Sequence, residues 1–379
     1  MRKIKTVHIH TDYKFVSNTE IFIGDKYENK IIIIKRDRPY PGPFKDDAVF
    51  LDKNNNTLTK VLEICNSADL VILYDLDTFK QKVALSLPGH IKIAWRFFGA
   101  ELYSKRKDLF LSNKTKQHVL QTTKIFSDLY LNPFKNFYHL LKHGVNPKKL
   151  FLKSLLRIDF MIVLSKDEYE FLSNYWNLPE FIKHPHFNFK YNEINLDEII
   201  NQKSTNPAIV IGNNRLMYNN HLDIIEEIEK IPQKSKYKFI FLFNYGPNEK
   251  YAHTVRNFIK DKNHYQMIDE LISPDKFDCF YQNINGLVMN SYRQMGGANI
   301  FLALLNGVKV YLNKKNILYT WLQNEGFKIF SIENFKTDLM HNQIIPEKTI
   351  LQYNFRQLIK FSEKYTNNDF QINLYDKLK

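Results

Sequence analysis

Residues 208–230 read AIVIGNNRLMYNNHLDIIEEIEK, and this stretch decides the class of fold. It opens with four apolar residues, three of them β-branched, a run that is typical of a parallel strand buried on both faces. Gly212 ends the run, polar residues follow as far as Asn220, and His221–Lys230 carries apolar residues at helical spacing. A strand, a glycine-led loop and a helix in succession predict an α/β domain with a parallel sheet.

The same alternation extends in both directions along the chain. Toward the C-terminus we expect a strand at Tyr237–Phe243, a helix at Tyr251–Lys260, and a strand, helix and strand at Gly286–Met289, Ile300–Leu305 and Val308–Leu312. Toward the N-terminus we expect a helix at Leu58–Asn66 among strands at Lys5–Ile9, Lys30–Ile34, Asp69–Tyr74, Ile91–Trp95 and Asp159–Leu164. Two such series predict two domains of the same class.

The length of 379 residues suits two domains, and a polar, asparagine-rich segment from Phe187 to Pro207 is predicted to link them. We expect an N-terminal domain at 1–200 with basic helices, a C-terminal domain at 207–345, and a helical segment at 346–379 that can pack back on the first domain. The predicted fold class is α/β, with two Rossmann-like domains facing across a cleft and ligands at the carboxyl ends of the strands.

Two loops of the C-terminal half contain residues suited to a phosphate group. Gly212-Asn213-Asn214 joins a strand to a helix, where glycine lets the backbone approach a phosphate and the helix start favours negative charge; an ordinary capped turn is the alternative. The segment 293–299 also joins a strand to a helix, and its arginine suits a diphosphate; a loop with a surface arginine is the alternative. From these two loops, the candidate phosphate-binding residues are Gly212, Asn213, Asn214, Arg293, Gly296, Gly297 and Asn299.

Two carboxylates of the N-terminal half follow predicted strands and are candidate catalytic groups. Asp12 comes after the first strand, and Glu101 lies in the segment Trp95–Tyr103, which runs from the end of another strand. A carboxylate beside a sugar hydroxyl can act as a general base. The alternative is that both residues are helix-capping groups.

No metal and no cofactor are predicted. Asp75-Leu76-Asp77 has the Asp-x-Asp pattern that can hold a metal–diphosphate, but such pairs are common by chance. Neither His-x-His pair lies near an acidic cluster, and the two cysteines are far apart in sequence, so we expect mostly structural histidines and buried thiols. These residues are His8, His10, His184, His186, Cys65 and Cys279.

The formal net charge is +14, and its main concentration is a helical stretch at 102–156. From Lys105 to Lys153 the stretch has 11 lysine or arginine residues and two acidic residues, with aromatic residues between them. A nucleic acid, an anionic membrane surface or a phosphorylated substrate would explain this charge, and a solvated helical face is the alternative. The N-terminus lacks the apolar core of a signal peptide, so we expect a cytoplasmic location.

The motifs, in this order, resemble those of the bacterial glycosyltransferase family 56. The family's W-x-x-W-G-x-D-L-Y segment is similar to 95–103, with Phe98 in place of the second Trp and Glu101 in place of Asp. Its G-N-S…N-x-H loop is similar to 212–221, and its R-Q-x-G-x-G segment to 293–297 with the last glycine displaced by one. Asp12 matches the Asp of the family's first loop, and the resemblance runs in order from residue 7 to residue 330.

This resemblance implies a GT-B glycosyltransferase without a metal requirement, in which the N-terminal domain binds the acceptor and the C-terminal domain binds the nucleotide sugar. The predicted nucleotide-sugar site then comprises Gly212, Asn213, Asn214, Asn219, His221, Asn244, Tyr245, Arg293, Gln294, Gly296, Gly297 and Asn299. The implied donor is a dTDP-sugar carrying N-acetylfucosamine (4-acetamido-4,6-dideoxygalactose) or a related sugar, and the implied acceptor is an undecaprenyl-diphosphate-linked oligosaccharide in surface polysaccharide synthesis. Such an acceptor places the enzyme peripherally on the cytoplasmic face of the inner membrane, with the basic stretch against the anionic membrane surface and no nucleic acid as partner. Two alternatives stay open: a UDP- or GDP-sugar-dependent GT-B transferase with another acceptor, and a non-enzymatic nucleic-acid-binding protein.

Overall fold

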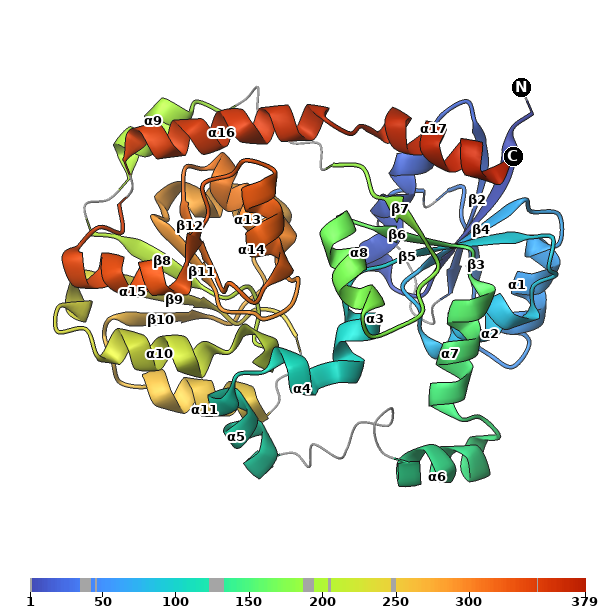
Figure 1. Ribbon diagram of the computed structural model, residues 1–379, viewed down its shortest axis with the longest axis horizontal. Helices are drawn as coiled ribbons and strands as arrows, with labels where there is room; N and C mark the ends of the chain where they lie inside the picture. The colour runs from blue at the N-terminus through green and yellow to red at the C-terminus, as the bar shows by residue number, and fades with distance from the viewer. Residues whose placement is uncertain are drawn as a thin grey trace. The chain divides into compact units, whose positions relative to one another are not determined.

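The computed structural model describes residues 2–34, 42–44, 46–122, 133–186, 194–203, 206–246, 250–345 and 347–379, and it contains two compact units (Figure 1). The first unit comprises Met1–Lys105, Phe126–His186 and Tyr365–Lys379, and the second comprises Arg106–Ile125 and Phe187–Lys364. Each unit is built on one parallel sheet flanked by helices, so the predicted α/β class with two Rossmann-like domains is confirmed.

The first unit has a seven-stranded sheet with the strand order β3-β2-β1-β4-β5-β6-β7. Its strands are β1 Ile4–His10, β2 Tyr27–Ile34, β3 Val49–Leu51, β4 Leu70–Tyr74, β5 Lys92–Arg96, β6 Phe160–Val163 and β7 Glu180–Lys183. Its helices are η1 Tyr13–Phe22, α1 Thr57–Cys65, α2 Thr78–Ser86, α3 Ala100–Tyr103, α6 Pro133–His143, α7 Pro147–Arg157, α8 Lys166–Ser173 and α17 Asn367–Leu378. The core includes Phe22 of η1 and Phe370 of α17 beside Ile72 and Ile162 of the sheet.

The second unit has a six-stranded sheet with the strand order β10-β9-β8-β11-β12-β13. Its strands are β8 Ala208–Ile211, β9 Lys238–Leu242, β10 Tyr265–Ile268, β11 Gly286–Met289, β12 Lys309–Leu312 and β13 Phe330–Ser331. Its helices are α4 Lys107–Phe110, α5 Asn113–Thr122, α9 Leu196–Gln202, η5 Met217–Asn219, α10 His221–Glu229, α11 Lys250–Ile259, α12 Pro274–Phe280, η7 Tyr281–Asn283, α13 Gly297–Leu305, α14 Ile317–Asn324, α15 Ile332–His341 and α16 Lys348–Glu363. The core includes Ile225 of α10, Val255 of α11 and Phe335 of α15 beside Phe239 of the sheet.

The predicted elements are all present, with ends that differ from the structure by no more than three residues. The strands that the sequence did not predict are β3, β7, β10 and β13, and each of them lies at an edge of its sheet. They have two to four residues, most of them partly exposed, whereas central strands such as β4 and β11 are buried throughout. Because edge strands are short and half-solvated, they lack the continuous apolar run that marks a central parallel strand.

The structure assigns part of the predicted N-terminal domain to the second unit. Helices α4 and α5 belong there because Val119 joins the second core and Lys114 forms an ion pair with Glu226 of α10. The basic stretch at 102–156 is therefore divided between the two units, and its residue Lys124 lies outside the described residues.

The C-terminal segment is divided as well. Helix α16 belongs to the second unit, where Phe361 stacks on Phe301 of α13 with ring centroids 5.4 Å apart. Helix α17 belongs to the first unit, where Gln371 donates hydrogen bonds to the carbonyl oxygens of Ile21 and Ile23. Residues 187–193 and 204–205 of the predicted linker lie outside the described residues.

Candidate functional site

Each sheet has one place where the strand order reverses. In the second sheet the chain runs from β8 outward to β9 and β10 and then returns to β11 on the other side of β8. In the first sheet the corresponding place lies between β1 and β4. Open parallel sheets bind ligands at this switch point, beyond the carboxyl ends of the strands. The loops after β8 and β11 contain most of the predicted nucleotide-sugar residues, and Asp12 follows β1.

The loop after β8 depends on a glycine at position 212. Gly212 has a φ of +69°, and its N–H donates to the carbonyl oxygen of Val288 at 2.8 Å. A Cβ at this position would lie 2.7 Å from Nε2 of His221 and 3.2 Å from Oδ1 of Asn219. Both the backbone conformation and the lack of space therefore require glycine.

Three other predicted residues build the framework of this loop. Asn219 donates from Nδ2 to the carbonyl oxygen and to Oδ1 of Asn214, each at 3.0 Å, and Asn214 Oδ1 also accepts from the Leu216 N–H at 2.9 Å. His221 is fully buried, and its N–H donates to the Tyr251 hydroxyl at 2.9 Å. Burial lowers the pKa of His221 to about 3, so this imidazole is neutral at physiological pH.

The loop after β11 meets the loop after β8. Gly296 has a φ of +69°, and a Cβ there would lie 2.5 Å from Cε of Met289 and 3.2 Å from Cγ of Asn213. Oδ1 of Asn213 is buried and accepts no hydrogen bond from the described residues. The structure thus brings together Asn213 and Gly296, which the sequence placed 83 positions apart (296 − 213 = 83).

Arg293 and the start of α13 lie in the same loop. The Arg293 N–H donates to the Ser291 hydroxyl at 3.3 Å, that hydroxyl donates to the Arg293 carbonyl at 2.8 Å, and the guanidinium lies 4.7 Å from the ring centre of Tyr218. No side chain caps α13, and a Cβ on Gly297 would meet only Nε2 of Gln294, at 3.9 Å. An arginine in the loop that leads to an uncapped helix start favours the binding of a phosphate there.

The remaining predicted residues of this site lie in different surroundings. Asn299 points away, because its Nδ2 donates to the hydroxyl of Tyr281 in η7, at the amino side of β11. Tyr245 is half exposed, and its carbonyl accepts from the N–H of Arg215 at 3.1 Å. Asn244 follows β9 and is partly buried. The structure therefore separates Asn299 from the other predicted donor residues.

At the switch point of the first unit, an ammonium group lies between two carboxylates. Lys80 of α2 has a side chain with 0% exposure, and its Nζ donates to Asp75 at 2.7 Å, to Thr11 at 2.6 Å and to Asp77 at 3.4 Å. The Thr11 hydroxyl donates to Asp77 at 2.6 Å. Burial raises the pKa of Asp75, whereas Lys80 and the hydroxyl of Thr11 hold the pKa of Asp77 low against the effect of its burial. The ammonium group of Lys80 thus lies between Asp75 and Asp77, where a metal ion held by both carboxylates would have to lie. The partner of the Asp-x-Asp pair in this structure is a lysine.

The two predicted catalytic carboxylates have contrasting environments. Asp12 is 42% exposed at its side chain, caps η1 by accepting from the Lys14 N–H at 3.2 Å, and pairs with the Lys14 ammonium at 3.0 Å. Glu101 accepts at Oε1 from Nε1 of Trp95 at 3.3 Å and from the Phe98 N–H at 3.2 Å, and its Oε2 is buried and accepts no hydrogen bond from the described residues. Burial is the main cause that raises the pKa of Glu101 to about 7. Both residues thus lie at helix starts, Asp12 in an exposed position and Glu101 in a buried one.

The histidines of the two His-x-His pairs lie inside the first unit. His8 contacts Tyr74 and Asn29, His10 contacts Thr19, and burial lowers the pKa of each. His184 and His186 are buried too. Among the described residues, no group of three or more His, Cys, Asp or Glu side chains could hold a metal ion.

The prediction of two buried thiols is half right. Cys65 is buried on α1, whereas Cys279 is exposed on α12.

Sequence reasoning missed Thr11, Lys80, Asn220, Asn290 and Ser291. Each follows a central strand or begins the next helix, and Asn220 and Asn290 are buried amides. Their place after apolar strands was a usable signal, but single polar residues in such loops are too common to select without the geometry.

Comparison with known proteins rests on structure alone, because no protein-family model and no curated protein matches the sequence. A glycosyltransferase from Rickettsia africae aligns over 100% of this chain and 99% of its own length, with 11% identity and a TM-score of 0.61. Sucrose-phosphate synthase from Thermosynechococcus elongatus aligns over 100% and 99%, with 11% identity and a TM-score of 0.66. Anabaena Alr3699/HepE, solved with UDP and glucose, aligns over 99% of both chains, with 10% identity and a TM-score of 0.61. The chain has the GT-B fold. At these identities the similarity establishes the fold and no more.

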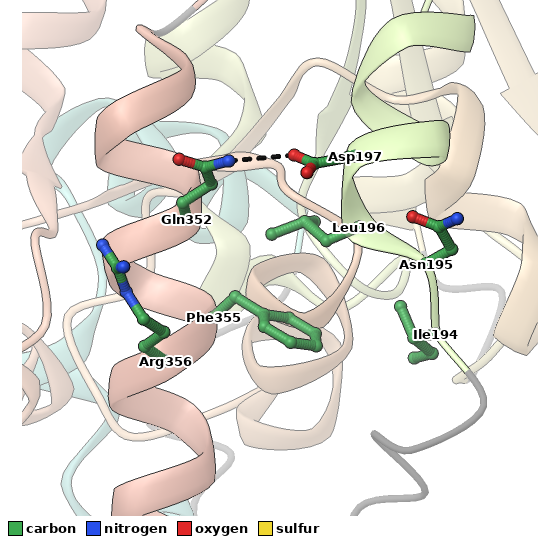
Figure 2. Close-up of a pocket in the computed structure, with 7 residues that line it drawn as sticks. All are labelled: Ile194, Asn195, Leu196, Asp197, Gln352, Phe355 and Arg356. Carbon is green, nitrogen blue, oxygen red and sulfur yellow. Dashed lines mark hydrogen bonds between the residues drawn. The ribbon is translucent and has the colours of Figure 1, made fainter.

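A pocket of this GT-B chain lies apart from the predicted site. It has a volume of about 550 Å³ and lies between α9 and α16, where Gln352 faces Asp197 and donates to it at 2.9 Å (Figure 2). Leu196, which lines it, also packs on Gly307, the residue of the turn that enters β12. The pocket is therefore on the amino side of the strands, opposite to the edge where such sheets bind ligands.

Proposed function

We propose that the chain is a sugar-nucleotide-dependent glycosyltransferase whose donor site is the switch point of the second unit. The observation that carries this proposal is the meeting of Asn213 with Gly296 beside Arg293, at the uncapped start of α13. Two glycines with left-handed backbones bring the main chain close to a ligand there, and a permanent cation supplies the charge that a diphosphate needs. The GT-B fold supports the same assignment.

In this proposal the second unit stabilises the leaving diphosphate. Arg293 and the N–H groups of the first turn of α13 would stabilise the negative charge that develops on the diphosphate as the sugar departs, without a metal ion. Gly212, Asn213 and Asn214 would lie against the phosphates or the ribose. This is electrostatic stabilisation by groups that are already held in place by the loop contacts described above.

The first unit would bind the acceptor. Glu101 is the better candidate for the base, because a carboxyl group whose pKa is about 7 exchanges protons readily near neutral pH. Asp12, which caps η1 and forms an ion pair with Lys14, would then orient the acceptor or the loop. Thr11 and the two carboxylates beside Lys80 provide further hydrogen-bonding groups at the same edge of the sheet.

The finer assignment follows the family resemblance. The donor would be a dTDP-sugar, with N-acetylfucosamine or a related aminodeoxy sugar, and the acceptor an undecaprenyl-diphosphate-linked oligosaccharide of a surface polysaccharide. A UDP-sugar donor is the second candidate, since the similar Anabaena protein was solved with UDP and with UDP-glucose.

A nucleotide panel tests the proposal and separates its variants. The full-length protein is melted with dTDP, UDP, GDP and a DNA oligomer. We expect dTDP to raise the melting temperature most and the oligomer not to raise it. A shift with UDP alone would replace the dTDP assignment, and a shift with the oligomer alone would overturn the transferase proposal.

A lipid-linked acceptor requires binding at a membrane surface. No helix among the described residues is long and apolar enough to cross a bilayer. Helices α6 and α7, with their connection (133–157), have six lysine or arginine residues and no acidic residue. On α6, Phe134, Phe137, Tyr138 and Leu141 follow the helical repeat and are 84%, 60%, 56% and 71% exposed. Aromatic and apolar side chains beside lysines suit the headgroup boundary of an anionic bilayer, so we assign the peripheral contact on the cytoplasmic face to this helix pair.

Vesicle co-sedimentation tests the membrane assignment. We expect binding to anionic vesicles that weakens with salt and is lost when Phe137 and Leu141 are changed to Ser. The change Leu271→Ser, at a side chain that is 78% exposed elsewhere, is the matched control and should bind as the wild type does. Equal binding to neutral vesicles, or wild-type binding by the α6 variant, would overturn the assignment.

A further inference from the structure

One segment of the N-terminal half is built into the second unit. Residues Arg106–Ile125 belong to the second unit and contain α4 and α5. The chain belongs to the first unit again from Phe126. Helix α5 packs beside α10 and α11, as Figure 1 shows for α11, and Val119 lies in the core of the second unit. The short connection between α4 and α5 lies next to Asn220, the residue that immediately precedes α10.

That residue, Asn220, is a buried junction of hydrogen bonds. Its Oδ1 accepts from the Ser112 N–H at 2.8 Å, and its Nδ2 donates to the Asn290 carbonyl at 3.1 Å. A second hydrogen bond joins the same two residues, because Nδ2 of Asn290 donates to the Asn220 carbonyl at 3.2 Å. Asn220 has 0% exposure and a φ of +47°. One amide side chain therefore joins the α4–α5 connection to the loops after β8 and β11.

The network continues at both of its ends. Asn290 accepts at Oδ1 from Nδ2 of Asn313, which follows β12, at 2.8 Å. The Ser112 hydroxyl donates to Asp223 of α10 at 2.6 Å. It also accepts, at 2.9 Å, from the N–H of Thr115 in the first turn of α5. These segments all meet at the carboxyl edge of the second sheet.

The neighbours of this junction along the chain are donor-site residues. Asn219 and His221, which surround Gly212, stand on either side of Asn220, and Asn290 is followed by the Ser291–Arg293 turn. A change at Asn220 must therefore affect both loops, although Asn220 itself is buried away from any ligand.

Asparagine meets three demands at this position. It tolerates a left-handed backbone better than most residues, and its amide both accepts and donates. Glycine would keep the backbone conformation and lose every side-chain bond. Because buried amide networks fix geometry when all partners are satisfied, the loss of one member releases the others.

We propose that Asn220 is a positioning residue of the donor site and that the segment 106–122 is part of that site's support. Through Asn220 this segment holds the loops after β8 and β11 at the spacing that lets Asn213 and Arg293 bind one diphosphate. The inference rests on the proposed donor site. It also means that the part of the chain after residue 187 has an incomplete donor site on its own.

The test compares Asn220→Gly with Asn342→Gly in the full-length protein. Asn342 is the matched control: it also has a left-handed backbone (φ +57°), belongs to the second unit, and accepts at Oδ1 from Tyr237 at 2.9 Å. We expect Asn220→Gly to weaken nucleotide binding and raise the KM for the donor by about tenfold, as for the loss of one or two buried hydrogen bonds, with no change in the KM for the acceptor. Asn342→Gly should leave both constants unchanged even if it lowers the melting temperature.

Amide hydrogen exchange distinguishes this inference from the proposed function. Asn220→Gly should speed exchange at 110–115, 213–219 and 291–296 relative to both the wild type and Asn342→Gly, whether or not a nucleotide binds. Wild-type nucleotide affinity in Asn220→Gly, with a lower melting temperature alone, would show a purely structural role and overturn the inference. Unchanged exchange in these loops would also overturn it, whereas a wild-type protein that binds no nucleotide would contradict the proposed function only.

Discussion

At the switch point of the first sheet, the ammonium of Lys80 lies between Asp75 and Asp77 with no exposure to solvent. At the switch point of the second sheet, the loop after β11 contains Arg293, whose guanidinium lies 4.7 Å from the ring centre of Tyr218, and leads into the uncapped start of α13. The first cluster thus has two carboxylates around one buried cation, whereas the loops of the second have a guanidinium and two glycines with left-handed backbones. The same strand topology therefore carries different groups at the two switch points.

This difference bears on the proposed roles of the two units. The carboxylates of the first cluster would repel a diphosphate, whereas a guanidinium attracts one. A sugar hydroxyl, in contrast, can donate to the carboxylates and can exchange hydrogen bonds with the hydroxyl of Thr11. The difference therefore favours our proposal that the donor binds to the second unit and the acceptor to the first.

The largest expected effect comes from removing the cation of the first cluster. Lys80→Met leaves Asp75 and Asp77 without their buried partner, so we expect a loss of about 3–5 kcal/mol in the free energy of unfolding. Urea denaturation measures it, with Lys92→Met as the control, since the exposed pair of Lys92 with Asp159 should contribute less than about 1 kcal/mol. Equal losses in the two variants would show that Lys80 is not the central charge of this cluster.

The next effect concerns the cation of the second cluster. Arg293→Ala should lower kcat/KM by an amount equivalent to about 2–4 kcal/mol, mainly through weaker diphosphate binding and leaving-group stabilisation. Arg256→Ala, which also removes a guanidinium near an aromatic ring (Phe243, 5.5 Å), is the control and should keep activity. A folded Arg293→Ala variant with wild-type kcat/KM would remove Arg293 from the donor site.

The raised pKa of Glu101 predicts that the free energy of unfolding depends on pH. Its folded pKa of about 7 lies above its ordinary value of 4.5, so the folded state binds more protons than the unfolded state between these values. Its contribution to stability is therefore complete below pH 4.5 and is lost as the pH rises through 7, a change of about 3 kcal/mol.

Unfolding measured across this range should show a weaker pH dependence in Glu101→Gln than in the wild type. If Glu101 is the base, the variant also loses turnover and the rise in rate near pH 7. Full turnover with both substrates saturating would leave Glu101 with a structural role only.

Asp12 should give the smallest effect. Its side chain is exposed and caps η1, so Asp12→Asn keeps the cap and loses only a surface ion pair with Lys14, which contributes less than about 1 kcal/mol. We expect near-normal stability and a modest loss of turnover in transfer assays. A loss of turnover as large as that of Glu101→Gln would make Asp12 the base and reverse the roles proposed here.

The sequence predicted the central strands because burial on both faces demands a continuous apolar run, as in β8 and β11. It also selected the two glycines and the arginine of the proposed donor site from their place between strand and helix. It could not predict that Asn299 points to Tyr281. Successive side chains in the first turn of a helix point in different directions, and the sequence alone does not show which of them face the loop. The Lys80 cluster and the Asn220 junction depend on contacts between segments 69 and 108 positions apart, for which the local pattern holds no signal.

The central claim is that a nucleotide binds at the second switch point and not at the first. Amide hydrogen exchange of the full-length protein, with and without the saturating nucleotide that most raises its melting temperature, tests this most directly. The account predicts slower exchange at 212–221 and 291–299 and no change at 11–14, 75–80 and 97–103. Protection confined to the loops of the first unit would contradict it.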